Sequence, residues 1–116
     1  MTARLDKLAP FAVSFTVTCA FFINLCAWIF ECGCHALWAG ADAMCNIHAA
    51  QARHCPWCSH GTTGYVASMV VLSAPQLAVS VFAPWGRTVR TATAVALFPL
   101  VGLLFALVSG WYDGYW

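Results

Sequence analysis

The chain consists of long apolar stretches separated by short polar ones. No charged side chain occurs in residues 8–30, 65–83 or 91–112. An α-helix rises about 1.5 Å per residue, so a stretch of about 20 residues crosses a hydrocarbon core about 30 Å thick. The pattern therefore predicts an all-α integral membrane protein. We expect a single membrane domain over residues 1–116, with three transmembrane helices and a polar loop at residues 31–64.

Several polar and small residues inside these spans are expected to mediate helix contacts. Pro75 frees a backbone carbonyl in the middle of the second span and should kink it. Gln76 and Asn24 are expected to form hydrogen bonds across helices. Gly102 and Gly110 lack side chains and would allow close approach of another helix.

Composition supports a membrane protein and gives no sign of nucleic-acid binding. Hydrophobic residues make up 62% of the chain and charged residues 8%, against roughly 45–50% and about 25% in soluble proteins. The formal net charge is only +1. A nucleic-acid-binding protein would show a basic patch, whereas the five basic residues are spread along this chain. We expect membrane lipid as a partner and no nucleic acid.

The basic residues also predict the orientation in the membrane. Arg4 and Lys7 precede the first span, and Arg87 and Arg90 lie between the second and third, whereas Arg53 alone lies in the loop. The positive-inside rule then gives a multi-pass protein of the inner (plasma) membrane, with a cytoplasmic N-terminus and an extracytoplasmic loop. The first apolar stretch exceeds a signal-peptide core of about 7–15 residues, so we expect a retained anchor.

The loop is rich in cysteine and histidine and is expected to contain an amphipathic helix. Residues 35–54 are rich in Ala and also contain Leu, Met and Gln, all of which favour helices. Spacings of three and four predict that a set of these side chains shares one helix face. That set is Cys34, Trp38, Ala41, Cys45, His48, Ala52 and Cys55.

Four of the loop side chains have the spacing of a metal site. Cys45 and His48 are one helical turn apart, and Cys55 and Cys58 form a CxxC turn, giving C-x2-H-x6-C-x2-C. Thiolates and imidazoles suit a tetrahedral zinc ion, so zinc is the expected metal, with copper or haem as alternatives. Five further residues are candidate ligands or supporting groups: Cys32, Cys34, His35, His54 and His60.

Three alternatives to a metal site remain open. The loop cysteines could form disulfides in an oxidising compartment, although their odd number and the nearby histidines favour metal. The CPWC sequence could instead exchange thiols and disulfides in a membrane oxidoreductase. Cys19 and Cys26 lie seven residues apart on one face of the first span and could belong to a heavy-metal importer, although a buried cysteine is more often a small hydrophobe.

The sequence contains no recognisable catalytic constellation and favours a non-enzymatic role. It has no glycine-rich phosphate loop, no serine elbow and no pair of carboxylates. Three short helices bury little surface alone, so other membrane-protein subunits are expected as partners. We interpret the chain as a metal-binding accessory or stabilising subunit of a larger membrane complex, with a metal importer or chaperone as an alternative.

Overall fold

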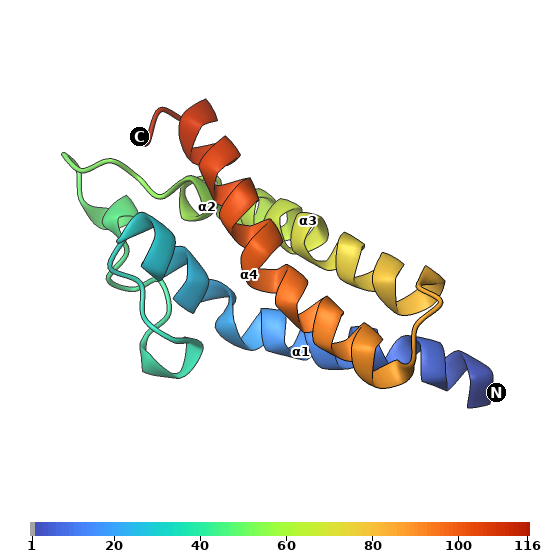
Figure 1. Ribbon diagram of the computed structural model, residues 1–116. Helices are drawn as coiled ribbons and strands as arrows, with labels where there is room; N and C mark the ends of the chain where they lie inside the picture. Colours follow the sequence, from blue (N-terminus) through green and yellow to red (C-terminus); the bar gives the residue numbers. More distant parts are fainter. Residues whose placement is uncertain (1) are drawn as a thin grey trace.

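The computed structural model describes residues 2–116, which form three long helices and a folded cap (Figure 1). The long helices are α1 (Thr2–Phe30), α3 (Gly61–Phe82) and α4 (Arg87–Tyr112), and all three are long and apolar enough to cross a membrane. A short helix, α2 (Pro56–Ser59), precedes α3. The described residues contain no β-strand. The all-α prediction with three such helices is therefore confirmed.

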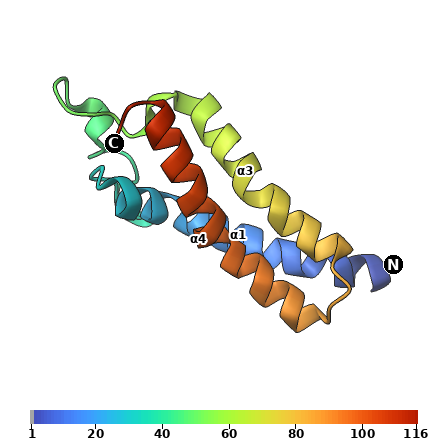
Figure 2. The same ribbon diagram turned by 45° about the horizontal axis from the view of Figure 1, so that its top comes forward.

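The three long helices pack against one another along their lengths. The N-terminus and the turn between α3 and α4 lie at one end of the bundle (Figures 1 and 2). The C-terminus and the cap, residues 31–60, lie at the other end. The outward surfaces of the helices expose many large apolar side chains, as a lipid-facing surface requires.

Gln76 joins all three helices in the middle of the bundle. Its side chain is fully buried in α3, and its Nε2 donates to Thr18 Oγ1 on α1 at 2.9 Å and to the carbonyl of Ala94 on α4 at 3.1 Å. The expected hydrogen bonds across helices are therefore present at Gln76. They are not found at Asn24, whose buried Oδ1 accepts no hydrogen bond from residues 2–116.

The structure begins α1 earlier than the apolar pattern indicates. The helix starts at Thr2, so Pro10 lies inside it rather than in its first turn. A proline there removes one backbone donor. The hydroxyl of Ser80 on α3 bridges the same turn, because it accepts from the N–H of Phe11 at 3.0 Å and donates to the carbonyl of Lys7.

The two glycines of α4 are used for contacts within the chain. A Cβ at Gly102 would lie 2.4 Å from Leu25 on α1, and a Cβ at Gly110 would lie 2.3 Å from the indole of Trp116. Close approach at both positions is therefore real. It serves α1 and the C-terminal segment, not an additional helix.

The cap does not contain the amphipathic helix expected over residues 35–54. Two single 3₁₀ turns, Leu37–Ala39 and Asn46–His48, replace it. Gly40 and Ala41 have left-handed φ values of 111° and 51°, which interrupt the helix after one turn. The chain then folds back. Cysteines that would have lined one helix face instead point inward from separate turns.

Candidate metal centre

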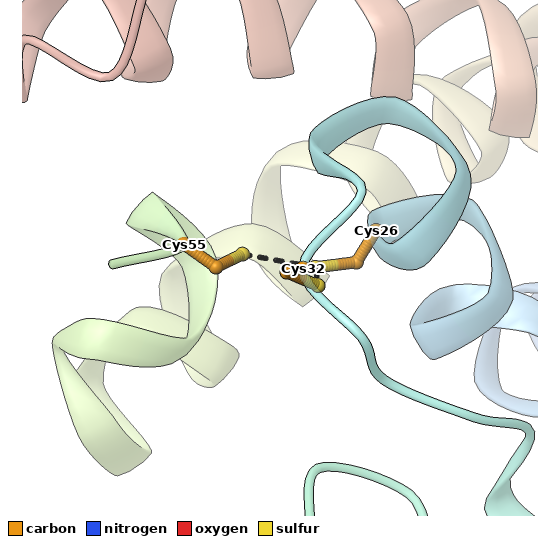
Figure 3. Close-up of side chains that lie close together, drawn as sticks. All are labelled: Cys26, Cys32 and Cys55. Carbon is orange, nitrogen blue, oxygen red and sulfur yellow. Dashed lines mark hydrogen bonds between the residues drawn. The ribbon is translucent and has the colours of Figure 1, made fainter. Parts of the chain in front are cut away.

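Six of the seven cysteines gather at the junction of the cap and the helices. They are Cys26, Cys32, Cys34, Cys45, Cys55 and Cys58, hereafter the thiol cluster, and each is at most 6% exposed. All are free thiols. Figure 3 shows three of them, which come from the last turns of α1, the start of the cap and the start of α2. Segments far apart in sequence therefore contribute sulfurs to one point.

The sulfur atoms lie close enough to bind the same ion. The Sγ of Cys26 is 3.1 Å from that of Cys55, 3.8 Å from that of Cys32 and 4.0 Å from that of Cys58. Cys32 is also 3.4 Å from Cys34. Two groups of three have all their sulfurs within 4.8 Å of one another: Cys26, Cys32 and Cys55, and Cys32, Cys34 and Cys45.

The end of α1 and the turn after it direct two of these thiols inward. Cys26 lies in the last turns of α1, and Glu31 follows the helix with a left-handed φ of 49°. Gly33 separates Cys32 and Cys34 with a φ of 85°, and a Cβ there would lie 2.6 Å from the carbonyl oxygen of Met44. Glycine is the residue that this turn tolerates, which explains a CGC sequence.

Trp57 anchors the CPWC turn inside the bundle. Its ring stacks on Phe22 of α1 and Phe105 of α4, with centroids 5.2 and 5.7 Å apart, and meets Phe30 edge-on. Its Nε1 donates to Ser109 Oγ at 3.1 Å. Tryptophans of membrane proteins are enriched at the membrane interface, but Trp57 is 1% exposed inside the bundle. It fixes the cysteines on either side relative to α1 and α4.

Asn46 ties the cap together around the cluster. Its backbone N–H donates to the carbonyl of Cys32 at 2.7 Å, and its Oδ1 accepts from the backbone N–H of Cys55 at 2.8 Å. Its Nδ2 donates to the hydroxyl of Tyr115 at 3.2 Å, and that hydroxyl donates to the carbonyl of Phe30. One residue thus connects two cysteine turns with the C-terminal segment, through its backbone N–H to one turn and through its side chain to the other turn and Tyr115.

The electrostatics of the cluster favour negative charge at two of its sulfurs. Hydrogen bonds from neighbouring thiols, first Cys26 and then Cys55, lower the pKa of Cys32 and of Cys58. Burial raises the pKa of the Cys45 thiol, although the backbone N–H of Ile47 opposes this effect. A thiolate is the form of cysteine that binds metal.

The four histidines are exposed and lie outside the two sulfur groups. The Nε2 of His48 is 3.0 Å from the carbonyl oxygen of Asp42, and that of His54 is 3.0 Å from the carbonyl of Ala49. The Nε2 of His60 pairs with Asp113 at 2.9 Å. The fourth, His35, also has an exposed side chain.

The candidate residues from the sequence are thus only partly brought together. The structure gathers the five loop cysteines Cys32, Cys34, Cys45, Cys55 and Cys58. It adds Cys26, which we had interpreted mainly as a small hydrophobe in the first span. A signal was present in the sequence, because Cys26 lies one helical turn before the end of the apolar stretch and six residues before Cys32.

Comparison with known proteins adds no family to this description. No protein-family model matches the chain, and neither a curated protein nor a solved structure shows significant similarity to it.

Proposed function

We propose that this chain is an integral membrane protein that binds a soft metal ion, zinc first, in the thiol cluster. The observation that carries the proposal is the burial of six sulfurs at one point, with groups of three within 4.8 Å. Thiolate ligands favour zinc, Cu(I) or iron–sulfur centres. The arrangement of three cysteines and His48 remains the alternative ligand set, and imidazole binding is one outcome of the tests below.

The burial of the cluster supports a structural role for the metal. Structural zinc sites are closed, whereas catalytic sites keep an open position. Cys26, Cys32 and Cys55 are each at most 2% exposed. A metal here would join the end of α1, the start of the cap and the turn around α2. Its binding energy would therefore contribute to folding of the cap.

Thiol exchange and metal import receive less support. An exchange reaction needs attack on an accessible sulfur, but Cys55 is fully buried and Cys58 is 4% exposed. An importer needs a path beyond the cluster. At mid-bundle the side chains of Leu72, Gln76 and Thr18 are fully buried and fill the space between the helices.

A stabilising metal fits our interpretation of the chain as an accessory subunit. We propose that the cap is extracytoplasmic and that the protein stabilises a larger assembly in the plasma membrane. The orientation is supported by an ion pair between Arg87 and Asp6 at 3.5 Å, which brings the basic turn after α3 to the basic N-terminus. Four of the five basic residues thus lie at the end opposite the cap.

Labelling of single added cysteines tests the orientation. Ser59 in the cap and Thr88 at the opposite end are both exposed. In a Cys19→Ser background with the cluster intact, Ser59→Cys should react with a membrane-impermeant maleimide in intact cells. Thr88→Cys should react only after lysis. The reverse pattern would contradict an extracytoplasmic cap.

Elemental analysis of the purified protein tests metal binding. Protein purified in a mild, sulfur-free detergent should contain zinc or another soft metal. Cys26→Ser should lose most of it, because Cys26 contacts three other sulfurs. Cys19→Ser removes the one cysteine outside the cluster and should retain it. Metal-free wild-type protein with disulfides in the cluster would refute the proposal.

A further inference from the structure

Five of the six sulfurs form two overlapping groups, and we propose that the cluster binds two divalent d10 ions that share a thiolate ligand. Cys32 is the bridging ligand in this assignment. Cys26, Cys55 and Cys58 complete one tetrahedral site, and Cys34 and Cys45 belong to the other. This inference rests on the proposed metal-binding function and specifies how the same thiols are used.

The overlap of the groups identifies the bridging ligand. Cys32 belongs to both sets of three sulfurs that lie within 4.8 Å of one another. It is 3.8 Å from Cys26 on one side and 3.4 Å from Cys34 on the other. Its sulfur therefore lies between the two groups.

The fourth ligand of the first site follows from the position of Cys58. This residue belongs to neither set of three, but its sulfur is 4.0 Å from that of Cys26. Cys58 therefore lies beside the first group and provides the fourth ligand that this set of three lacks.

The number of thiols exceeds what one tetrahedral ion uses. A single ion would use four sulfurs and leave two buried thiols beside it, whereas with one shared sulfur six thiols fill seven of the eight ligand positions of two ions. A tetrahedral ion with Zn–S bonds of about 2.3 Å separates its sulfurs by about 3.8 Å. The separations of 3.8 and 4.0 Å from Cys26 to Cys32 and Cys58 agree with that value. The separations of 3.1 Å from Cys26 to Cys55 and 3.4 Å from Cys32 to Cys34 are shorter and would widen when an ion binds.

The ratio of metal to sulfur measures the number of bound ions. Seven cysteines and three methionines give ten sulfurs per chain, so two ions give a metal-to-sulfur ratio of about 0.2. Cys45→Ser removes a ligand of one site only and should halve this ratio. Cys19→Ser is the matched control, and its metal content per chain should remain at two. A wild-type ratio of about 0.1 would overturn the two-ion proposal and leave the proposed function intact, whereas a ratio near zero would overturn both.

Titration of the metal-free wild-type protein with Co²⁺ avoids any dependence on a variant that fails to fold. Ions that share a thiolate bridge are magnetically coupled. The high-spin Co²⁺ electron paramagnetic resonance signal should therefore rise during the first equivalent and fall during the second. A signal that grows in proportion to bound Co²⁺ up to two equivalents would show separate sites and contradict the shared thiolate. Saturation at one equivalent would contradict the second ion.

Discussion

Replacing Asn46 with alanine tests whether the cap is held together by its polar network. The substitution removes the acceptor of the Cys55 backbone N–H and the donor to the Tyr115 hydroxyl. It leaves the backbone N–H of residue 46, which bonds to Cys32, in place. The side chain is also the acceptor nearest the Cys45 thiol, at 3.7 Å. The change thus removes support from the cluster, including this acceptor of the Cys45 thiol, and deletes none of its sulfurs.

The expected loss of stability follows from these contacts. Each net hydrogen bond contributes about 1 kcal/mol, and a buried donor left without an acceptor costs about 1–3 kcal/mol. Cys55 is fully buried, so its N–H has no route to water. We expect Asn46→Ala to lower the free energy of unfolding by about 2–4 kcal/mol. Metal affinity should fall with it, because binding and cap folding are coupled.

The other asparagine of the chain provides a matched control. Asn24 lies in α1, and its Oδ1 is buried without a donor from residues 2–116. Removing an unsatisfied polar group costs little, so Asn24→Ala should change stability by less than about 0.5 kcal/mol or increase it. Unfolding with sodium dodecyl sulfate, followed by tryptophan fluorescence, measures both variants. Equal losses for the two substitutions, or no loss for Asn46→Ala, would refute this account of the cap.

Three further outcomes are expected from other parts of the structure. Gly33→Ala places a Cβ at a left-handed φ of 85° and 2.6 Å from the Met44 carbonyl oxygen. It should lower the free energy of unfolding by at least about 2 kcal/mol. Gly114→Ala also has a left-handed φ, of 70°, but its Cβ would lie in open space, so it should lower the free energy of unfolding by less. Gln76→Leu should destabilise the bundle by about 1–2 kcal/mol, because it loses the hydrogen bonds between helices. Gln51→Leu in the exposed part of the cap should have little effect on stability. The same unfolding assay compares the two glycine variants and the two glutamine variants. A metal chelator should raise the number of thiols that react with Ellman's reagent from about one to seven; seven reactive thiols before chelation would contradict a closed metal site.

The three long apolar helices could be predicted because their signal is local. A run of apolar residues long enough to cross a bilayer must satisfy its backbone hydrogen bonds internally, and a helix does so. The predicted limits at residues 8 and 91 were late, since α1 and α4 begin at Thr2 and Arg87. Hydropathy marks where the apolar surface begins. The helices extend past that point into polar residues.

The cap could not be predicted in the same way because its structure depends on distant contacts. Its composition favours a helix, but Gly40 and Ala41 interrupt it and the buried thiols draw the chain inward. Cys26 was assigned to the first span and the other five cysteines of the thiol cluster to the loop, although the end of a helix and the loop that follows it can contact each other. The burial of Trp57 could not be predicted either, because its partners Phe22 and Phe105 are far away in sequence.

X-ray absorption at the edge of the bound metal tests the central claim most directly, because it identifies the atoms that bind the metal. Six converging thiols and four exposed imidazoles predict a shell of four sulfurs at about 2.3 Å, with no scattering from imidazole. Cys19→Ser should give the same spectrum as the wild-type protein. A shell of three sulfurs and one nitrogen at about 2.0 Å, lost in His48→Ala, would contradict an all-thiolate site and support the ligand set of three cysteines and one histidine.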